Sequence, residues 1–132
     1  MLKVLALTLT AAASAAYAQP ASKPHQWMFT GVDDMKFNHY VDLGSALRHG
    51  DIVMMWSMQD VPPQFVMPGL SYAYSAAYDC RLGYDKPYYW ATYSGHMATG
   101  RVLESSGEED WKPISGGEWS DRDLACRFGK DG

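Results

Sequence analysis

The sequence has few cysteines and no cluster of positive charge. Its two cysteines, Cys80 and Cys126, form no CxxC motif and have no histidine close by in the sequence. This spacing argues against a zinc site built from thiolates. The formal net charge is −4, and lysine and arginine are scattered. Because nucleic acids and anionic membranes repel a negative surface, the composition argues against both as partners.

The sequence also lacks an apolar run long enough to cross a membrane, which needs about 20 strongly apolar residues. Its most apolar stretch follows Lys3, covers residues 4–9 and leads through small residues to Ala16, Tyr17 and Ala18. A basic start, a short apolar run and an A-x-A end are typical of a secretory signal peptide. We expect residues 1–18 to be a signal peptide removed before Gln19. A buried N-terminal helix is the alternative.

The rest of the chain is predicted to form one domain. Residues 19–24 contain two prolines, which prevent a helix and favour a flexible leader. Residues 25–129 show no internal repeat and no second linker, and their number suits a single domain with one modest core.

The two cysteines are expected to form a disulfide bond. Export would place Cys80 and Cys126 in an oxidising compartment, where a bonded pair is the usual state. The chain between the two cysteines is a long loop, and in the loop-entropy account closing it stabilises the fold by about 4 kcal/mol. This is comparable with the whole stability of a small domain. A pair of free or metal-binding thiols is the alternative.

Alternating apolar and polar residues predict a β-rich domain. The clearest alternation is in residues 70–84, where tyrosine or another large side chain recurs at every second position and Cys80 points to the core. Within residues 51–59 the predicted inward set is Ile52, Met54, Trp56 and Met58. Residues 44–50 are predicted to be a short helical turn, and residues 85–87 a turn between strands. The expected strands are residues 25–32, 37–43, 51–59, 70–84, 88–94 and 101–105.

The pattern changes to helical spacing near the C-terminus. Ser120 is the predicted N-cap of a helix that begins at Asp121, with Trp119 and Leu124 as its hydrophobic staple. Gly129 is expected to end the helix. The fold class is therefore predicted to be α+β, an antiparallel sheet of about five or six strands with a C-terminal helix tied to it by one disulfide.

A series of short motifs follows a characteristic order between residues 25 and 128. They are Trp27-Met28-Phe29, Tyr40-Val41-Asp42, Ser45, Gly50, Met54-Met55-Trp56, Ser71-Tyr72, Asp79-Cys80, Trp111-Lys112-Pro113-Ile114 and Leu124-Ala125-Cys126. This series resembles the surface-adhesin protein E family of small exported bacterial proteins. The resemblance implies an antiparallel sheet with a helix tied to it by the two cysteines. It also implies adhesion, because family members include outer-membrane proteins that bind host matrix and serum proteins and can dimerise.

One position departs from the lipoprotein members of that family. An adhesin lipoprotein needs a cysteine at the signal cleavage site, and position 19 is Gln. We therefore expect a protein that is soluble in the periplasm or secreted.

No catalytic or metal-binding constellation is expected. The histidines at positions 25, 39, 49 and 96 lack metal-ligand spacing, so no metal or cofactor is predicted. His39 is expected to be a hydrogen-bonded core residue. A triad of His39, Asp42 and Ser45 would lack a nucleophile elbow and an oxyanion loop. The acidic runs 33–34 and 108–110 lack calcium-ligand spacing and are predicted to be solvated turns.

Aromatic residues are the abundant feature, with five tryptophans and nine tyrosines. Tyr88, Tyr89, Trp90 and Tyr93 occupy both faces of one predicted strand, so they are the candidate binding residues. Packing of a thin sheet against its helix is the alternative role. The sequence therefore predicts a non-catalytic module that binds a protein ligand, with an inhibitor of a secreted enzyme such as lysozyme as the alternative. Unpaired sheet edges favour a homodimer.

Overall fold

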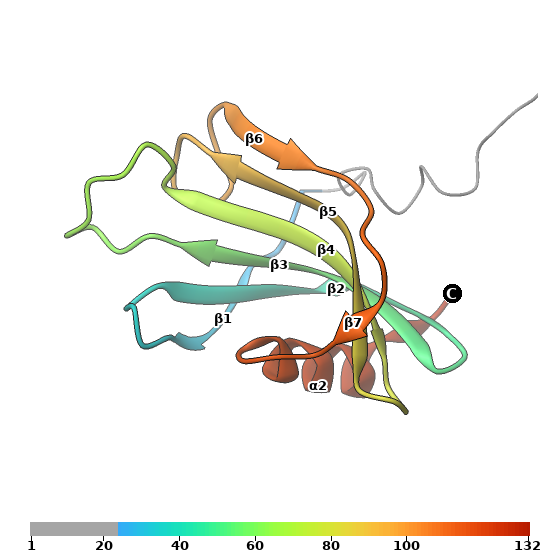
Figure 1. Ribbon diagram of the computed structural model, residues 1–132. Coiled ribbons are helices and arrows are strands. Elements are labelled where there is room, and N and C mark those ends of the chain that lie inside the picture. Colours follow the sequence, from blue (N-terminus) through green and yellow to red (C-terminus); the bar gives the residue numbers. More distant parts are fainter. Residues whose placement is uncertain (1–23) are drawn as a thin grey trace, which may run out of the picture.

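The computed structural model describes residues 24–132, which form one curved sheet with a helix against one of its faces (Figure 1). The predicted signal peptide and all but the last residue of the predicted leader lie outside the described residues. The main path of the sheet is antiparallel, in the order β1-β2-β3-β4-β5-β6; β7 pairs with β5, and β8 pairs in parallel with β2. The elements are β1 (Met28–Val32), β2 (Asn38–His49), β3 (Ile52–Asp60), β4 (Ser71–Asp79), β5 (Tyr84–Tyr93), β6 (Val102–Ser106), β7 (Lys112–Pro113), α2 (Glu118–Phe128) and β8 (Lys130–Asp131). This arrangement confirms the predicted α+β fold class.

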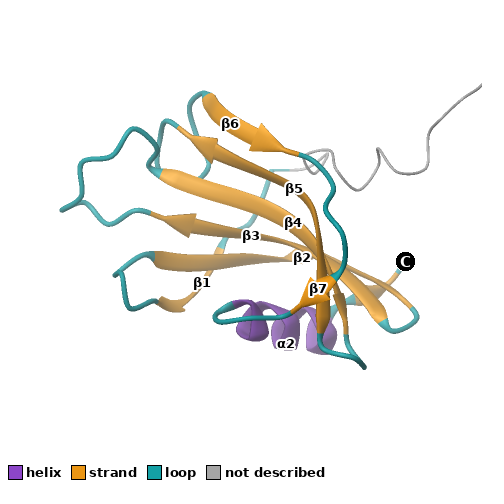
Figure 2. Cartoon of the chain, viewed as in Figure 1, coloured by secondary structure: helices purple, strands orange, loops and turns teal. Residues whose placement is uncertain are grey.

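Apolar side chains cover both faces of the central strands. On the helix face, the buried core includes Val53 and Met55 of β3, Tyr78 of β4 and Ala125 of α2. On the opposite face, a second cluster forms around Trp56, Met58 and Ala73, and it is covered by Trp27, Tyr89, Tyr93, Met97 and Ala98. Side chains of the N-terminal segment and of the loop after β5 thus cover the face of the sheet opposite the helix. Figure 2 shows α2 against the other face.

This double burial corrects the prediction for β3. The predicted inward set, Ile52, Met54, Trp56 and Met58, points away from the helix, whereas Val53 and Met55, on the other face of the strand, form the core under α2. Period-2 alternation identifies two faces but does not reveal that both are covered.

The predicted helical turn at residues 44–50 is wrong, because β2 continues to His49. The strand bulges between Asp42 and Leu47 and then resumes its pairing with β3. Within the bulge, the Asp42 carboxylate accepts a hydrogen bond from the Gly44 amide, and the Ser45 hydroxyl accepts one from the Trp56 amide. Side chains thus satisfy the backbone donors where the regular ladder is interrupted.

The predicted strand of residues 70–84 is in fact a strand and a hairpin turn. β4 ends at Asp79, whose carboxylate accepts hydrogen bonds from the amides of Arg81 and Leu82. Gly83 has a φ of +69°, and a Cβ there would lie 2.9 Å from the Trp119 ring. Residues 85–87, predicted to be the turn, belong to β5, where Pro87 lies opposite Ala76 beside a bulge. The alternating tyrosines continue across the turn and conceal it.

The helix begins three residues before its predicted start. Its N-cap is Gly117, with no side-chain cap, and Ser120 lies inside the first turn. The amides of Glu118, Trp119 and Ser120 donate to the carbonyls of Ser115, Gly116 and Gly117, so the helix grows out of a tight preceding turn. The predicted cap at Ser120 and the staple of Trp119 and Leu124 are therefore wrong, whereas Gly129 ends the helix as predicted.

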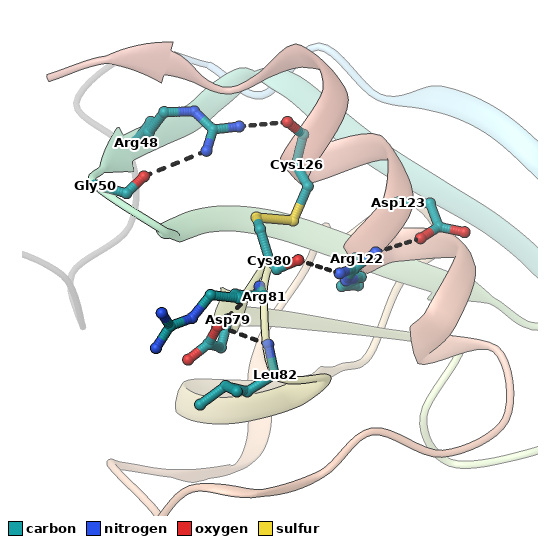
Figure 3. The surroundings of a disulfide bond; sticks show 9 residues. All are labelled: Arg48, Gly50, Asp79, Cys80, Arg81, Leu82, Arg122, Asp123 and Cys126. Atoms are coloured by element: carbon teal, nitrogen blue, oxygen red, sulfur yellow. Dashed lines mark hydrogen bonds and ion pairs between the residues drawn. A yellow bond between two sulfur atoms is a disulfide. The ribbon is translucent and has the colours of Figure 1, made fainter.

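The disulfide between Cys80 and Cys126 joins the β4–β5 turn to the last turns of α2 (Figure 3). The Cα atoms lie 5.7 Å apart, and Cys80 follows the last residue of β4. Arg122 donates to the carbonyl oxygen of Cys80, and Arg48 of β2 donates to that of Cys126. The bond and its two arginines hold the helix to the sheet, which confirms the predicted disulfide.

We predict that the Cys80→Ala, Cys126→Ala double variant loses about 4 kcal/mol of unfolding free energy, because a bridge across 46 positions restricts the unfolded chain. Urea unfolding of both proteins measures the loss. A reducing agent should destabilise the wild type similarly and leave the double variant unchanged. A loss under about 1 kcal/mol would contradict a stabilising role for the bond.

Candidate binding pocket

A pocket of about 410 Å³ opens on the helix face of the sheet, beside the start of α2. Its floor comes from β2 to β5, and its far wall comes from the chain that returns from β6 to α2. A hydrogen bond of 2.9 Å from the Glu109 amide to the Pro87 carbonyl fixes this returning segment, as does one of 3.1 Å from the Ile114 amide to the Gly83 carbonyl. The lining residues are Asp33, His39, Gln59, Tyr72, Tyr74, Ala76, Asp85, Pro87, Trp90, Glu109, Lys112, Ser115, Gly117 and Glu118.

Three aromatic rings form part of the floor. The Tyr72 ring centroid lies 5.3 Å from that of Tyr74 and 5.8 Å from that of Trp90. Burial, followed by the charges of Glu109 and Glu118, raises the pKa of the Tyr72 hydroxyl to about 12. Glu109 and Glu118 thus act on the Tyr72 hydroxyl from the wall of the pocket.

Tyr74 also anchors the helix. Its hydroxyl donates a 2.5 Å hydrogen bond to the carboxylate of Asp121, which is buried in the first turn of α2. Burial raises the pKa of the Asp121 carboxyl, and the Tyr74 hydrogen bond opposes that rise. A buried carboxylate without such a donor would be costly, so this pair fixes how the first turn of the helix sits against the floor.

Asp85, Lys112 and Glu118 form a charged group at the inner end of the pocket. The Lys112 ammonium lies 3.3 Å from Glu118 and 3.7 Å from Asp85. Asp85 is 2% exposed, and its Oδ1 has no hydrogen-bond donor within residues 24–132. Burial and then the charge of Glu118 raise the pKa of Asp85 to about 6, although Lys112 opposes the rise. The group thus carries two carboxylates and one ammonium.

His39 and Asp33 form the opposite rim. The Nε2 atom of His39 lies 2.8 Å from Asp33 Oδ2. Burial alone would raise the pKa of Asp33, but the hydrogen bond with His39, those from the amides of Phe37 and Met35 and the charge of His39 together lower that pKa. His39 is thus hydrogen-bonded, as predicted, but it lines an open pocket.

The imagined triad of His39, Asp42 and Ser45 does not assemble. Asp42 lies on the other face of the sheet, where His25 Nδ1 is 2.8 Å from its carboxylate. The Ser45 hydroxyl donates to the Asp42 carbonyl. Ser115 lines the same pocket as His39, yet no hydrogen bond joins the two in the part of the chain that the structure describes. That part also contains no group of three or more side chains suited to hold a metal ion.

The four aromatic residues proposed from the sequence are distributed over β5. Trp90 lines the pocket. Tyr89 and Tyr93 face the other way, where they pack against the second core, and the Tyr89 ring lies 5.9 Å from that of Trp56. The Lys86 ammonium lies over the ring of Tyr88. Trp90 is therefore brought together with Tyr72 and not with its predicted companions.

Sequence reasoning missed the charged pocket residues Asp85, Glu109, Lys112 and Glu118. They come from β5, a loop, β7 and α2, so no local pattern unites them. The only signal was Asp85 itself, a carboxylate between aromatic positions, and the turn predicted for residues 85–87 concealed it.

We predict that Asp85→Asn raises the unfolding free energy at pH 7.5 by up to about 3 kcal/mol, because a pKa near 6 means that the ionised carboxylate opposes folding. The stabilising form is the protonated one, which is lost as pH rises through about 6. The advantage of the variant should therefore vanish toward pH 4, where the wild-type side chain is also neutral.

Urea unfolding across this pH range tests the prediction, with Asp110→Asn, an exposed change of equal charge, as the matched control. The stability difference between the control and the wild type should vary little with pH. A variant less stable than the wild type at pH 7.5 would show that Asp85 is a structural anchor.

The family of the chain follows from its sequence. The sequence model for surface-adhesin protein E matches residues 27–126, from just before β1 to the cysteine of α2. No curated protein matches the chain. The family and the disulfide together indicate an adhesin-like protein that is exported or at the cell surface. Within residues 24–132, no helix is long and apolar enough to cross a membrane. The chain belongs to the surface-adhesin protein E family.

Proposed function

We propose that this chain is an exported, non-catalytic module that binds a protein partner with the pocket beside α2. The observation that carries the proposal is the aromatic floor of Trp90, Tyr72 and Tyr74 in an open pocket of about 410 Å³. Large rigid aromatics in a partly desolvated hollow are typical of binding hot spots. Membership of an adhesin family supports a protein as the ligand.

Exposed apolar residues beside the pocket support a macromolecular partner. Asp33, on the rim, belongs to the turn that exposes Met35, and its carboxylate accepts hydrogen bonds from the amides of Met35 and Phe37. The Phe37 ring lies 6.2 Å from that of Phe65, in a loop where Val66 is fully exposed. Contiguous apolar residues at a surface favour contact with another protein.

The pocket geometry favours binding over catalysis. Its only imidazole, His39, is engaged by Asp33, and the hydroxyl of Ser115 makes no hydrogen bond to it within the described residues. A nucleophile without a hydrogen-bonded base is not activated. Turnover of a substrate that His39→Ala abolishes would contradict this part of the proposal.

Trp90 is the residue of the predicted binding set on which the proposal depends. Tyr88, Tyr89 and Tyr93 lie elsewhere on β5 and remain predicted binding residues for a wider contact. Tyr89 and Tyr93 also support the strand from behind, as part of the second core.

We predict that the exported protein binds an immobilised matrix or serum protein and that Trp90→Ala weakens this binding at least about tenfold, since loss of a central aromatic costs about 2 kcal/mol or more. Biosensor titration measures the dissociation constants. Trp111→Ala removes an exposed tryptophan that does not line the pocket and is the matched control, with an expected change under about threefold.

The same samples separate adhesion from enzyme inhibition. Loss of lysozyme activity at a stoichiometric amount of this protein, without matrix binding, would favour the inhibitor. Equal weakening by Trp90→Ala and Trp111→Ala would show that the pocket is not the binding site.

We also predict that the protein forms a dimer at high micromolar concentration. Within the described sheet, β1 and β6 are edge strands, and they expose Phe29, Val32, Val102 and Leu103. Sedimentation that shows only monomer would contradict this. A lysine at Val32 or Val102 should weaken the dimer at whichever edge forms it.

A further inference from the structure

The pocket carries more negative than positive charge. Among its lining residues, His39 is engaged with Asp33 and Lys112 lies between Asp85 and Glu118. One ammonium thus faces two carboxylates. Glu109 adds a third, which has no ion-pair partner within residues 24–132. Acidic residues in the first turn of α2 offset the partial positive charge of its N-terminus. An anionic ligand is therefore disfavoured.

Asp85 supplies an independent indication of a missing donor. It lines the pocket, is 98% buried, and its Oδ1 accepts no hydrogen bond within residues 24–132. Buried carboxylate oxygens are nearly always hydrogen-bonded, because an unpaired one loses its hydration without compensation. A ligand that brings N–H donors and positive charge would supply what this oxygen lacks.

The aromatic floor restricts the shape of that ligand. Tyr72 and Trp90 lie side by side, with ring centroids 5.8 Å apart. Aromatic faces attract cations and pack against aliphatic chains, and guanidinium groups also stack on them. Carboxylates next to aromatic faces therefore suit a cationic group on an aliphatic stem. A neutral sugar could stack on the same rings but would leave the excess charge unmatched.

We infer that this pocket takes a basic side chain of the protein partner, with its guanidinium or ammonium group at Asp85, Glu118 and Glu109 and its stem on Tyr72 and Trp90. The inference rests on the proposed function and specifies the chemistry of its site. The exposed apolar residues beside Asp33 favour a side chain presented by a protein over a free amine. Arginine suits the site best, because its planar group can both stack and donate to two carboxylates.

A proton on Asp85 competes with this ligand. The groups that face Asp85 are Glu118 of α2, Lys112 of β7 and Tyr78 of β4. Burial, the charge of Glu118 and a hydrogen bond with Glu118 favour the protonated carboxyl and outweigh Lys112, which favours the ionised one. A cation that donates to Oδ1 would displace that proton. Binding should therefore weaken about tenfold between pH 7.5 and pH 5, given a pKa of about 6.

The test uses the isotope-labelled protein and a capped, glycine-flanked peptide that contains one arginine. Its counterpart has citrulline in place of arginine, a neutral side chain of nearly the same shape. We expect saturable NMR shifts of the Trp90 indole and of the amides of Tyr72, Asp85 and Glu118 with arginine, and none with citrulline. Free arginine and spermidine should bind more weakly than the peptide.

Two variants of equal charge change separate local recognition from general attraction. Asp85→Asn should weaken peptide binding about tenfold and remove its pH dependence, whereas Asp110→Asn, outside the pocket, should change it less than about twofold. The melting temperature of each variant checks that it folds. Glu109→Gln, on the loop, provides a second pocket variant if Asp85→Asn fails to fold.

Three results would overturn the inference: equal shifts with citrulline, equal effects of Asp85→Asn and Asp110→Asn, or tighter binding of a free amine than of the peptide. None depends on finding the natural partner. A matrix protein that binds through Trp90 but ignores Asp85→Asn would retain the proposed function and refute this inference. Arginine binding in the pocket without any protein ligand would retain this inference and refute the proposed function.

Discussion

The bond between Cys80 and Cys126 fixes the position of α2, and the start of the helix in turn forms one side of the pocket. The helix is short and covers one end of one sheet face. Its last turns are joined to the β4–β5 turn, and its first turn is held by the Tyr74 hydrogen bond to Asp121. Fixing both ends leaves the neighbouring part of the sheet uncovered, and the pocket lies there.

The rest of the chain is subject to a constraint common to small domains, which can bury only a limited part of their apolar surface. This sheet gains apolar contact on both faces: α2 covers one, and the N-terminal segment with the loop after β5 covers the other. Trp56 and Met58 therefore lie buried at positions that would face solvent in a sheet with one covered face. The aromatic-rich composition is partly explained by this second core, and Tyr72, Tyr74 and Trp90 are the rings that line the pocket.

The charged group of the pocket destabilises the fold, whereas the double core stabilises it. Asp85 is buried next to another carboxylate, with one ammonium to share between them. A neutral residue of the same size would suit the fold better at neutral pH, so folding alone does not account for the carboxylate. A binding role would account for it, because the positive group of a ligand compensates for the excess charge only in the complex. This makes the electrostatics consistent with a binding module of the adhesin family.

Local pattern determined the strands, the helix near the C-terminus, its end at Gly129 and the pairing of the only two cysteines, because each depends on neighbouring residues or on cysteine number. Tertiary structure decided where the strands begin and end and where the helix begins. Asp79 and the contact of Gly83 with Trp119 close the β4–β5 turn inside an unbroken alternation. The pocket likewise brings together Asp85 of β5, Lys112 of β7 and Glu118 of α2. Sequence periodicity shows which face a side chain takes, but only the packing of distant segments decides what that face meets.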